Sequence, residues 1–161
     1  LVRIEGGRDF ADASIGQGSL SSYAGFVEFV VPQAHEIEAI EQAFLAKARE
    51  TVGSLEPYRA ERLYGVGGTA RAAAKLYAAL QGEGTRPKVL TPAHFDAIVD
   101  ELAHDPSAFA HAAARAVPER IHTVMPGCVI LRTLMRELHA RELEVCKRGV
   151  REGYLIERML A

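Results

Sequence analysis

Arg62-Leu-Tyr-Gly-Val-Gly-Gly-Thr-Ala-Arg71 is the stretch around which the rest of the chain is organised. Residues 62–66 predict a short buried strand, and Gly67-Gly68 predicts a tight turn. From residue 69 to residue 80 apolar side chains recur at helical spacing, which predicts a helix. We therefore expect a strand, a glycine turn and a helix N-terminus in direct succession.

This succession offers a place where an anion can bind. Gly67 and Gly68 lack Cβ atoms, so a ligand can approach the backbone, and the free N–H groups and the dipole of a helix start attract phosphate above all. Thr69 adds a hydroxyl group that can cap the helix or bind a ligand oxygen. The same turn is required wherever a helix packs closely on a sheet, so the stretch alone leaves a structural role equally open.

The composition is that of an ordinary globular protein. The 161 residues are enough for one domain with a sizeable core, and 48% of them are hydrophobic and 25% charged. The formal net charge of −2 gives no overall basic field for nucleic acid or an anionic membrane, so any anion site has to be local. Without an apolar run of membrane-spanning length or a signal-peptide pattern, we expect a cytoplasmic location. Because the first residue is Leu1 and not Met, we also expect a segment of a longer protein.

Cysteine and histidine give no sign of a metal centre or a catalytic thiol. Cys128 and Cys146 fall on separate predicted elements without metal-ligand spacing, which favours reduced thiols. The six histidines form no pair four residues apart with a third ligand nearby. We expect neither zinc nor a nucleophilic cysteine.

The chain before the central stretch predicts a hairpin, a strand and a helix. Residues 2–15 predict a β-hairpin with its turn at Gly6-Gly7. The apolar run 23–32 predicts a third strand that pairs back on the hairpin, and the polar patch before it is either a loop near a ligand or a surface turn. Residues 34–53 predict an amphipathic helix packed on the sheet. Its glutamates are expected to be solvated surface: Glu36, Glu38 and Glu41.

The chain after the central stretch predicts four helices and one strand. Two cap residues, each followed by proline, predict two short helices, which we interpret as a helical insertion over residues 91–116. A longer helix begins at Pro126-Gly127, and its leucine and methionine stripe is interpreted as core, with a partner groove as the alternative. A strand over 143–150 and a helix over 151–160 complete the order. This order predicts a single α/β domain over residues 1–161, with a mixed sheet and helices on its faces, as in RNase H-like domains.

Three motifs of the chain follow one another in the order and spacing of a known family. They are Gly65-Val-Gly-Gly-Thr-Ala-Arg71, Arg120-Ile-His-Thr-Val-Met-Pro-Gly-Cys-Val-Ile-Leu131 and Val145-Cys-Lys-Arg-Gly-Val-Arg-Glu-Gly153. They resemble motifs of the Ppx/GppA phosphatases, the exopolyphosphatase and guanosine pentaphosphate phosphohydrolase family. The family pattern reads Gly-Gly-Thr-Ala-Arg, then Arg-Ala-Asp before a Pro-Gly or Ala-Gly helix start, then Gly-Leu-Arg-Glu-Gly.

The resemblance implies the fold of the actin-like ATPase superfamily, in which two RNase H-like domains close around a phosphate-binding cleft. It covers only the second of these domains, without its first strand and the Gly-Gly-Gly-Ser loop that follows. The first domain of the family carries another phosphate loop and the glutamate that activates the attacking water. We therefore expect no catalytic residue in this chain, and a general base in a missing N-terminal domain.

The implied reaction is hydrolysis of a terminal phosphoanhydride, in polyphosphate or guanosine pentaphosphate, with Mg²⁺ as cofactor. The resemblance implies phosphate contacts for five residues: Gly67, Gly68, Thr69, Arg71 and Arg120. For Arg71, a side chain lying over the sheet edge is an equally good interpretation. No Mg²⁺ ligand is identifiable, and residues 149–153 are interpreted as a turn and helix start.

Two departures from the family pattern keep other functions open. His122 stands where the family has aspartate, and Ser21 where it has arginine. If these two departures have removed the catalytic activity, the same cleft would bind guanosine tetraphosphate or pentaphosphate without turnover. A third possibility is a domain that forms a homodimer through an exposed sheet edge and the helix 127–138. In every case we predict that the 161 residues alone have no hydrolytic activity.

Overall fold

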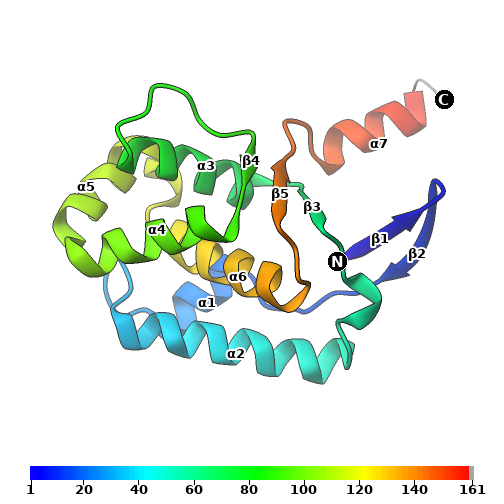
Figure 1. Ribbon diagram of the computed structural model, residues 1–161, viewed down its shortest axis with the longest axis horizontal. Coiled ribbons are helices and arrows are strands. Elements are labelled where there is room, and N and C mark those ends of the chain that lie inside the picture. Colours follow the sequence, from blue (N-terminus) through cyan, green and yellow to red (C-terminus); the bar gives the residue numbers. More distant parts are fainter. Residues whose placement is uncertain (160–161) are drawn as a thin grey trace.

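The chain begins with the predicted β-hairpin. In the computed structural model, which describes residues 1–159, β1 (Val2–Glu5) pairs antiparallel with β2 (Arg8–Asp12), with Gly6 and Gly7 at positive φ between them. The two strands form a sheet of their own, which projects from one end of the molecule (Figure 1).

The prediction of a third strand over residues 23–32 is wrong. Helix α1 (Ser19–Phe26) takes the first half of this run, and a loop follows it. The Ser21 hydroxyl group caps α1, since it accepts the N–H of Gly18 and donates to the carbonyl of Gly18, both at 3.0 Å. This local capping outweighs the strand preference of the apolar residues that follow.

Helix α2 (Ala34–Val52) confirms the predicted amphipathic helix, but Glu36 is not solvated as expected. Its side chain is buried, and its carboxylate accepts the N–H groups of Glu28 at 2.9 Å and Gln33 at 2.7 Å. Glu41 is half-buried and pairs with Arg132 at 3.0 Å. Glu36 thereby ties the loop after α1 to the start of α2.

Replacing Glu36 by Gln is expected to lower the free energy of unfolding by about 1–3 kcal/mol, because a buried carboxylate that accepts two partly buried N–H groups is replaced by a neutral amide that cannot accept both. Urea denaturation followed by circular dichroism measures the change. Glu38→Gln, at an exposed position of the same helix, is the control and should change stability by less than about 0.5 kcal/mol. Equal stability of the two variants would contradict a structural role for Glu36.

The central sheet is mixed, as predicted, and contains three strands in the order β3-β5-β4. Strands β3 (Arg62–Gly65) and β5 (Glu142–Val145) are parallel, whereas β4 (Val89–Leu90) is antiparallel to β5 and was not predicted. Strand β3 lies at the edge of the sheet, and its Tyr64 is 63% exposed, so the expected buried strand is covered on one face only. The strand predicted over residues 143–150 ends at Val145.

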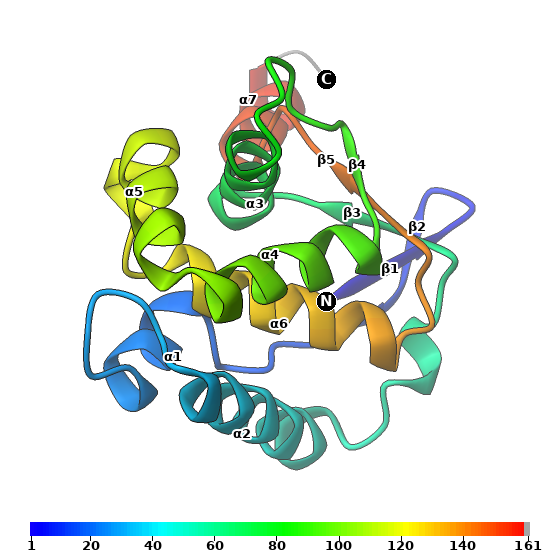
Figure 2. The same ribbon diagram turned by 60° about the vertical axis from the view of Figure 1, so that its left-hand side comes forward.

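Four helices build most of the core: α3 (Gly68–Leu80), α4 (Pro92–His104), α5 (Pro106–Ala116) and α6 (Val124–Glu137). Helix α6 runs through the middle, between α2 on one side and α3 and α4 on the other (Figure 2). Segment 91–116 contributes Phe95, Ile98 and Phe109 to this core, all fully buried. Met135 and Leu138 are also buried, which confirms the interpretation of the stripe on α6 as core.

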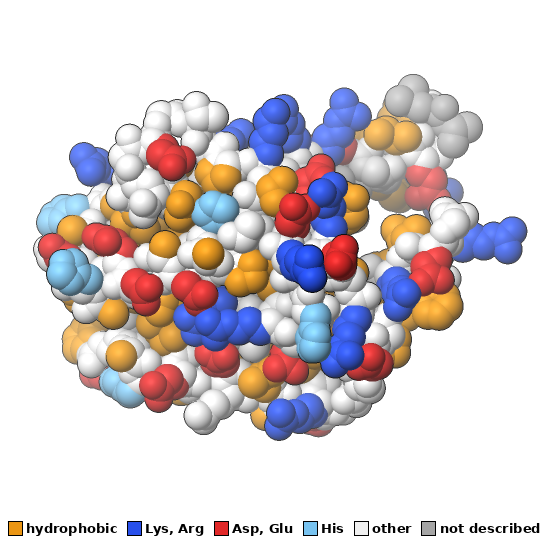
Figure 3. Space-filling model, viewed as in Figure 1, with side chains coloured by type: hydrophobic (Ala, Val, Ile, Leu, Met, Phe, Trp, Pro, Cys, Tyr) orange, Lys and Arg blue, Asp and Glu red, His pale blue; other side chains and the backbone are white. Residues whose placement is uncertain are grey.

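Helix α7 (Val150–Met159) confirms the predicted last helix, whose final residue Leu160 lies outside the described residues. None of its described side chains is buried, and it points away from the other helices (Figure 1). Hydrophobic side chains are exposed on α7 and on the hairpin at the same end of the molecule (Figure 3). Among residues 1–159, no helix combines the length and the hydrophobicity that a bilayer crossing requires.

Candidate functional site

The glycines of the central stretch have distinct structural roles. A Cβ atom at Gly65 would lie 2.7 Å from Cβ of Ala70 and 2.8 Å from Cδ2 of Leu143, so β3 and α3 pack too closely for a side chain there. Gly67 precedes α3 at a φ of 132°, which side chains disfavour. The close packing of helix on sheet thus depends on Gly65, because an added Cβ atom at Gly67 or Gly68 would not meet the sheet.

The guanidinium group of Arg120 lies over Gly68, in the first turn of α3. A Cβ atom at Gly68 would lie 2.6 Å from Cζ and 3.0 Å from Nε of Arg120, and would also overlap Nη2. Arg120 comes from the short 3-10 turn η2 (Pro118–Arg120), which follows α5. Gly68 therefore provides the space that this arginine occupies.

This position is electrostatically unfavourable for a cation. The N-terminus of a helix carries partial positive charge, so Arg120 adds a second positive charge to the first. Within residues 1–159, no carboxylate lies within ion-pairing distance of Arg120, which is half-buried. An anion between Arg120 and the first turn of α3 would compensate both charges.

The first turn of α3 has backbone donors available for such an anion. No side chain caps this helix, and the Thr69 hydroxyl group, which we expected to cap it or to bind a ligand, has no hydrogen bond to any residue in 1–159. The methyl group of Thr69 lies where a Cβ atom of Gly127 would be, and Ser19 is 3.4 Å from the same point. The starts of α1, α3 and α6 therefore converge near this turn.

Arg71 lies along the carboxyl ends of the two parallel strands. Its Nη1 donates to the carbonyl oxygen of Cys146 at 3.5 Å, and the N–H of Cys146 donates to the carbonyl of Gly65 at 3.1 Å. Arg71 is half-buried next to the Gly-Gly turn, so its side chain follows the sheet edge. This is the edge where parallel strands of α/β proteins bind their ligands.

The motif at residues 149–153 starts a helix, as interpreted from the sequence. The carboxylate of Glu152 accepts the N–H of Gly149 at 2.8 Å, and this hydrogen bond is the main reason why the pKa of Glu152 lies below its usual value. The charges of Arg151 and Arg71 lower the same pKa further. The positive charge of Arg71 therefore acts on the Glu152 carboxylate at the start of α7.

The two departures from the family pattern have local partners. The His122 ring is exposed, with its centroid 5.0 Å from that of Tyr23. Ser21 is used to cap α1.

Metal binding and thiol chemistry find no support in the described part of the chain. Within residues 1–159, no three His, Cys, Asp or Glu side chains are grouped so that they are able to hold a metal ion. Arg120 lies over the turn and Arg71 lies at the adjoining sheet edge, and these cationic side chains do not fit a Mg²⁺ site. Burial raises the pKa of the Cys128 thiol to about 12, so this thiol is protonated at neutral pH and is no nucleophile.

The structure brings together Gly67, Gly68, Thr69 and Arg120, with Arg71 at the adjoining sheet edge. Sequence reasoning missed Gly65 as the residue that allows close packing. The alternation of the strand could have shown this, because Gly65 shares the inward face of β3 with Leu63, two residues before it. It also missed Gly127, which no periodicity distinguishes from an ordinary helix-start glycine.

Comparison with known proteins supports the fold. Residues 12–161 match the model of the Ppx/GppA phosphatase family, while no curated protein sequence matches the chain. Solved structures of the Aquifex aeolicus PPX-GPPA enzyme, and of the Aquifex aeolicus member used to characterise the family, align with TM-scores of 0.77 and 0.76 at 20% and 19% identity. The type II variant of the Aquifex aeolicus phosphatase gives 0.70 at 21%.

These alignments cover 98–99% of this chain and 52% of each solved chain, so the chain spans about half the length of these relatives. At such identities the likeness concerns the fold alone. It is a mixed α/β, RNase H-like fold.

Proposed function

The chain belongs to the Ppx/GppA phosphatase family, and we propose that it is one of two domains of a cytoplasmic hydrolase that releases terminal phosphate from polyphosphate or guanosine pentaphosphate. Family membership supports the phosphatase chemistry. The coverage of 52% of the solved relatives supports a second domain that completes the cleft.

The observation that carries this proposal is the Arg120 guanidinium group over Gly68, at the positive end of α3. Phosphoryl transfer depends mainly on positioning and on stabilisation of the charge that spreads over the phosphoryl oxygens. In the proposed complex the first-turn N–H groups of α3 donate to these oxygens, and Arg120 neutralises their charge. Arg71 holds the adjoining sheet edge and adds positive charge.

The described residues supply binding and electrostatics, and the general base is assigned to the other domain. Mg²⁺ is implied by the family, but within residues 1–159 the side chains around α3 offer no set of ligands for it. The chain by itself is then expected to bind the phosphate chain without hydrolysing it.

The test is phosphate release from long-chain polyphosphate and from guanosine pentaphosphate, side by side, with the two-domain protein and Mg²⁺. Release from at least one substrate is expected, and Arg120→Gln should lower kcat/KM by about 10²- to 10³-fold, as for loss of one donor to a transition-state oxyanion. Arg49→Gln, an exposed arginine of α2, is the matched control and should keep wild-type activity. Absence of release from both substrates, or full activity of Arg120→Gln, would refute the proposal.

One observation favours a second candidate, a module that binds guanosine tetraphosphate or pentaphosphate without turnover. The His122 ring packs against Tyr23 at the position where the family has a carboxylate. The phosphate-release assay together with a binding titration of guanosine tetraphosphate separates the two candidates, because tight binding without phosphate release supports the second.

A further inference from the structure

Gly127 is a buried glycine in the first turn of α6, and Thr69 of α3 fills the space beside it. A Cβ atom at Gly127 would overlap Cγ2 of Thr69, and it would lie 3.7 Å from Cβ of Thr69 and 3.4 Å from Cβ of Ser19. Glycine has the lowest helix propensity after proline, so its place inside a helix calls for a packing reason. At Gly25 and Gly153, which also lie inside helices, an added Cβ atom would have no neighbour within 4 Å. Of these three glycines, only Gly127 is required by the close approach of two helices.

This contact fixes the rotamer of the Thr69 side chain. The Cβ atom of threonine carries a methyl group and a hydroxyl group, so the place of one determines the place of the other. Because the methyl group of Thr69 occupies the space beside Gly127, the hydroxyl group is held in one orientation. Thr69 is half-buried, and its hydroxyl group has no hydrogen-bond partner within residues 1–159. The first turn of α3 thus holds a fixed side chain whose polar group is available to a ligand.

An atom added at Gly127 could not be accommodated without changing this arrangement. Cγ2 of Thr69 is bonded directly to Cβ, so it moves only by rotation about χ1, which carries the hydroxyl group with it, or by a shift of the helix backbone. A shift of the backbone would also move the first-turn N–H groups of α3. At Gly68, by contrast, the overlapping group is the flexible end of Arg120.

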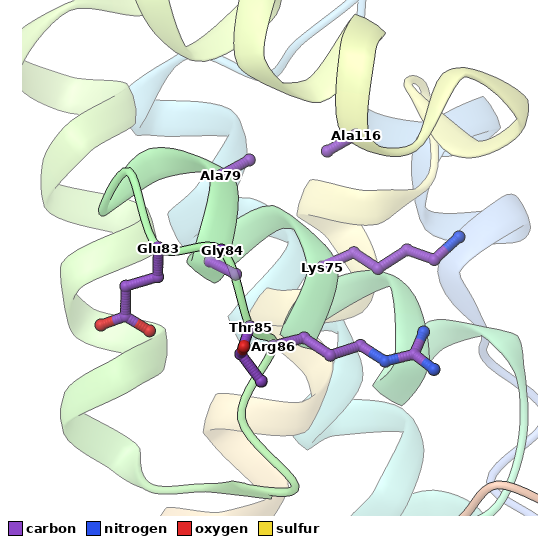
Figure 4. Close-up of a pocket in the computed structure, with 8 residues that line it drawn as sticks. Lys75, Ala79, Glu83, Gly84, Thr85, Arg86 and Ala116 are labelled. Atoms are coloured by element: carbon purple, nitrogen blue, oxygen red, sulfur yellow. The ribbon is translucent and has the colours of Figure 1, made fainter.

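Two glycines allow neighbouring elements to approach the start of α3 closely. Strand β3 lies against it at Gly65, and α6 lies against it at Gly127. Farther along, α3 borders a shallow hollow of about 490 Å³, with Lys75 and Ala79 on the helix and Ala116 on the facing wall (Figure 4). The position of the first turn therefore depends on the contacts at these two glycines.

We propose that Gly127 is a positioning residue of the phosphate turn. By leaving room for the methyl group of Thr69, it fixes χ1 of this side chain and holds the hydroxyl group where it donates to an oxygen of the bound phosphate. The inference rests on the proposed function, because it requires an anion at the first turn of α3. It goes beyond that function in giving a role to a residue of α6 that does not itself touch the ligand.

The test is calorimetric titration of the chain with diphosphate, next to a thermal melt of each variant. Gly127→Ala is expected to bind diphosphate about tenfold more weakly than wild type, since a hydrogen bond to a charged group is lost. Adding Thr69→Ser should restore the affinity to within about threefold of wild type, because serine keeps the hydroxyl group and lacks the methyl group that overlaps the new Cβ atom. Gly153→Ala adds the same methyl group at an exposed helix position without neighbours and is the matched control, expected to bind like wild type.

Thr69→Val tests the same contact without disturbing the packing, because valine keeps a methyl group beside Gly127 and replaces the hydroxyl group by a methyl group of similar size. It is expected to bind about tenfold more weakly at an unchanged melting temperature. Wild-type affinity of Thr69→Val or of Gly127→Ala would refute the inference and leave the phosphate turn standing. If Thr69→Ser does not restore binding, Gly127 supports only the fold, and the inference is refuted as well. Absence of diphosphate binding by the wild-type chain would refute the phosphate turn itself, which none of the other outcomes does.

Discussion

Gly68→Ala is expected to weaken anion binding at α3 at least about tenfold while the chain stays folded. The added Cβ atom overlaps the guanidinium group of Arg120, which is the far end of a flexible side chain and can swing away. Alanine also has a higher helix propensity than glycine, by up to about 1 kcal/mol, so the substitution does not destabilise α3 itself. What is lost is the cation above the first turn, together with backbone access for a phosphate.

The effect is measured by calorimetric titration of diphosphate, next to a thermal melt of the same sample. We expect affinity to fall at least about tenfold, since a charge-assisted contact is worth about 1.5–3 kcal/mol. Arg120→Gln should also weaken binding, and the double variant should bind no worse than Gly68→Ala alone, because Gly68→Ala already displaces the Arg120 guanidinium group. Additive losses would show that Gly68 and Arg120 act separately.

The sequence was sufficient for the elements whose signals are local. The glycine turn, the start of α3 and the two proline-initiated helices depend on cap residues, glycine positions and apolar spacing within a few residues. The sequence was insufficient where the apolar run 23–32 carried a strand preference but Ser21 capped a helix at its start. Strand β4 has only two residues, too few for any alternation to be visible.

The site could be predicted only in part, for a similar reason. The Gly67-Gly68 turn is readable from the chain, but the approach of Arg120 depends on how η2 leads back over α3 after two intervening helices. Only the order of the family motifs pointed to that arginine. The burial of Glu36 likewise depends on a loop that folds back eight residues away, at Glu28, which helical periodicity does not register.

Gly65→Ala is expected to lower the free energy of unfolding by about 1–3 kcal/mol, in contrast to Gly68→Ala. Its Cβ atom would lie 2.7 Å from Cβ of Ala70 and 2.8 Å from Cδ2 of Leu143. The Ala70 atom is fixed to the helix backbone and Leu143 is 1% exposed, so neither gives way without moving α3 or β5. Overpacking of this kind costs about 1–3 kcal/mol or more.

Urea denaturation midpoints measure this change against Gly25→Ala, a matched control in α1 where an added Cβ atom has no neighbour within 4 Å. The control should be neutral or slightly stabilising. Adding Ala70→Gly to Gly65→Ala should recover part of the loss, because it removes the nearer of the two clashing atoms. A Gly65→Ala variant as stable as wild type would show that β3 and α3 are not packed at this distance. In that case the position of the phosphate turn, which joins these two elements, would also have to be revised.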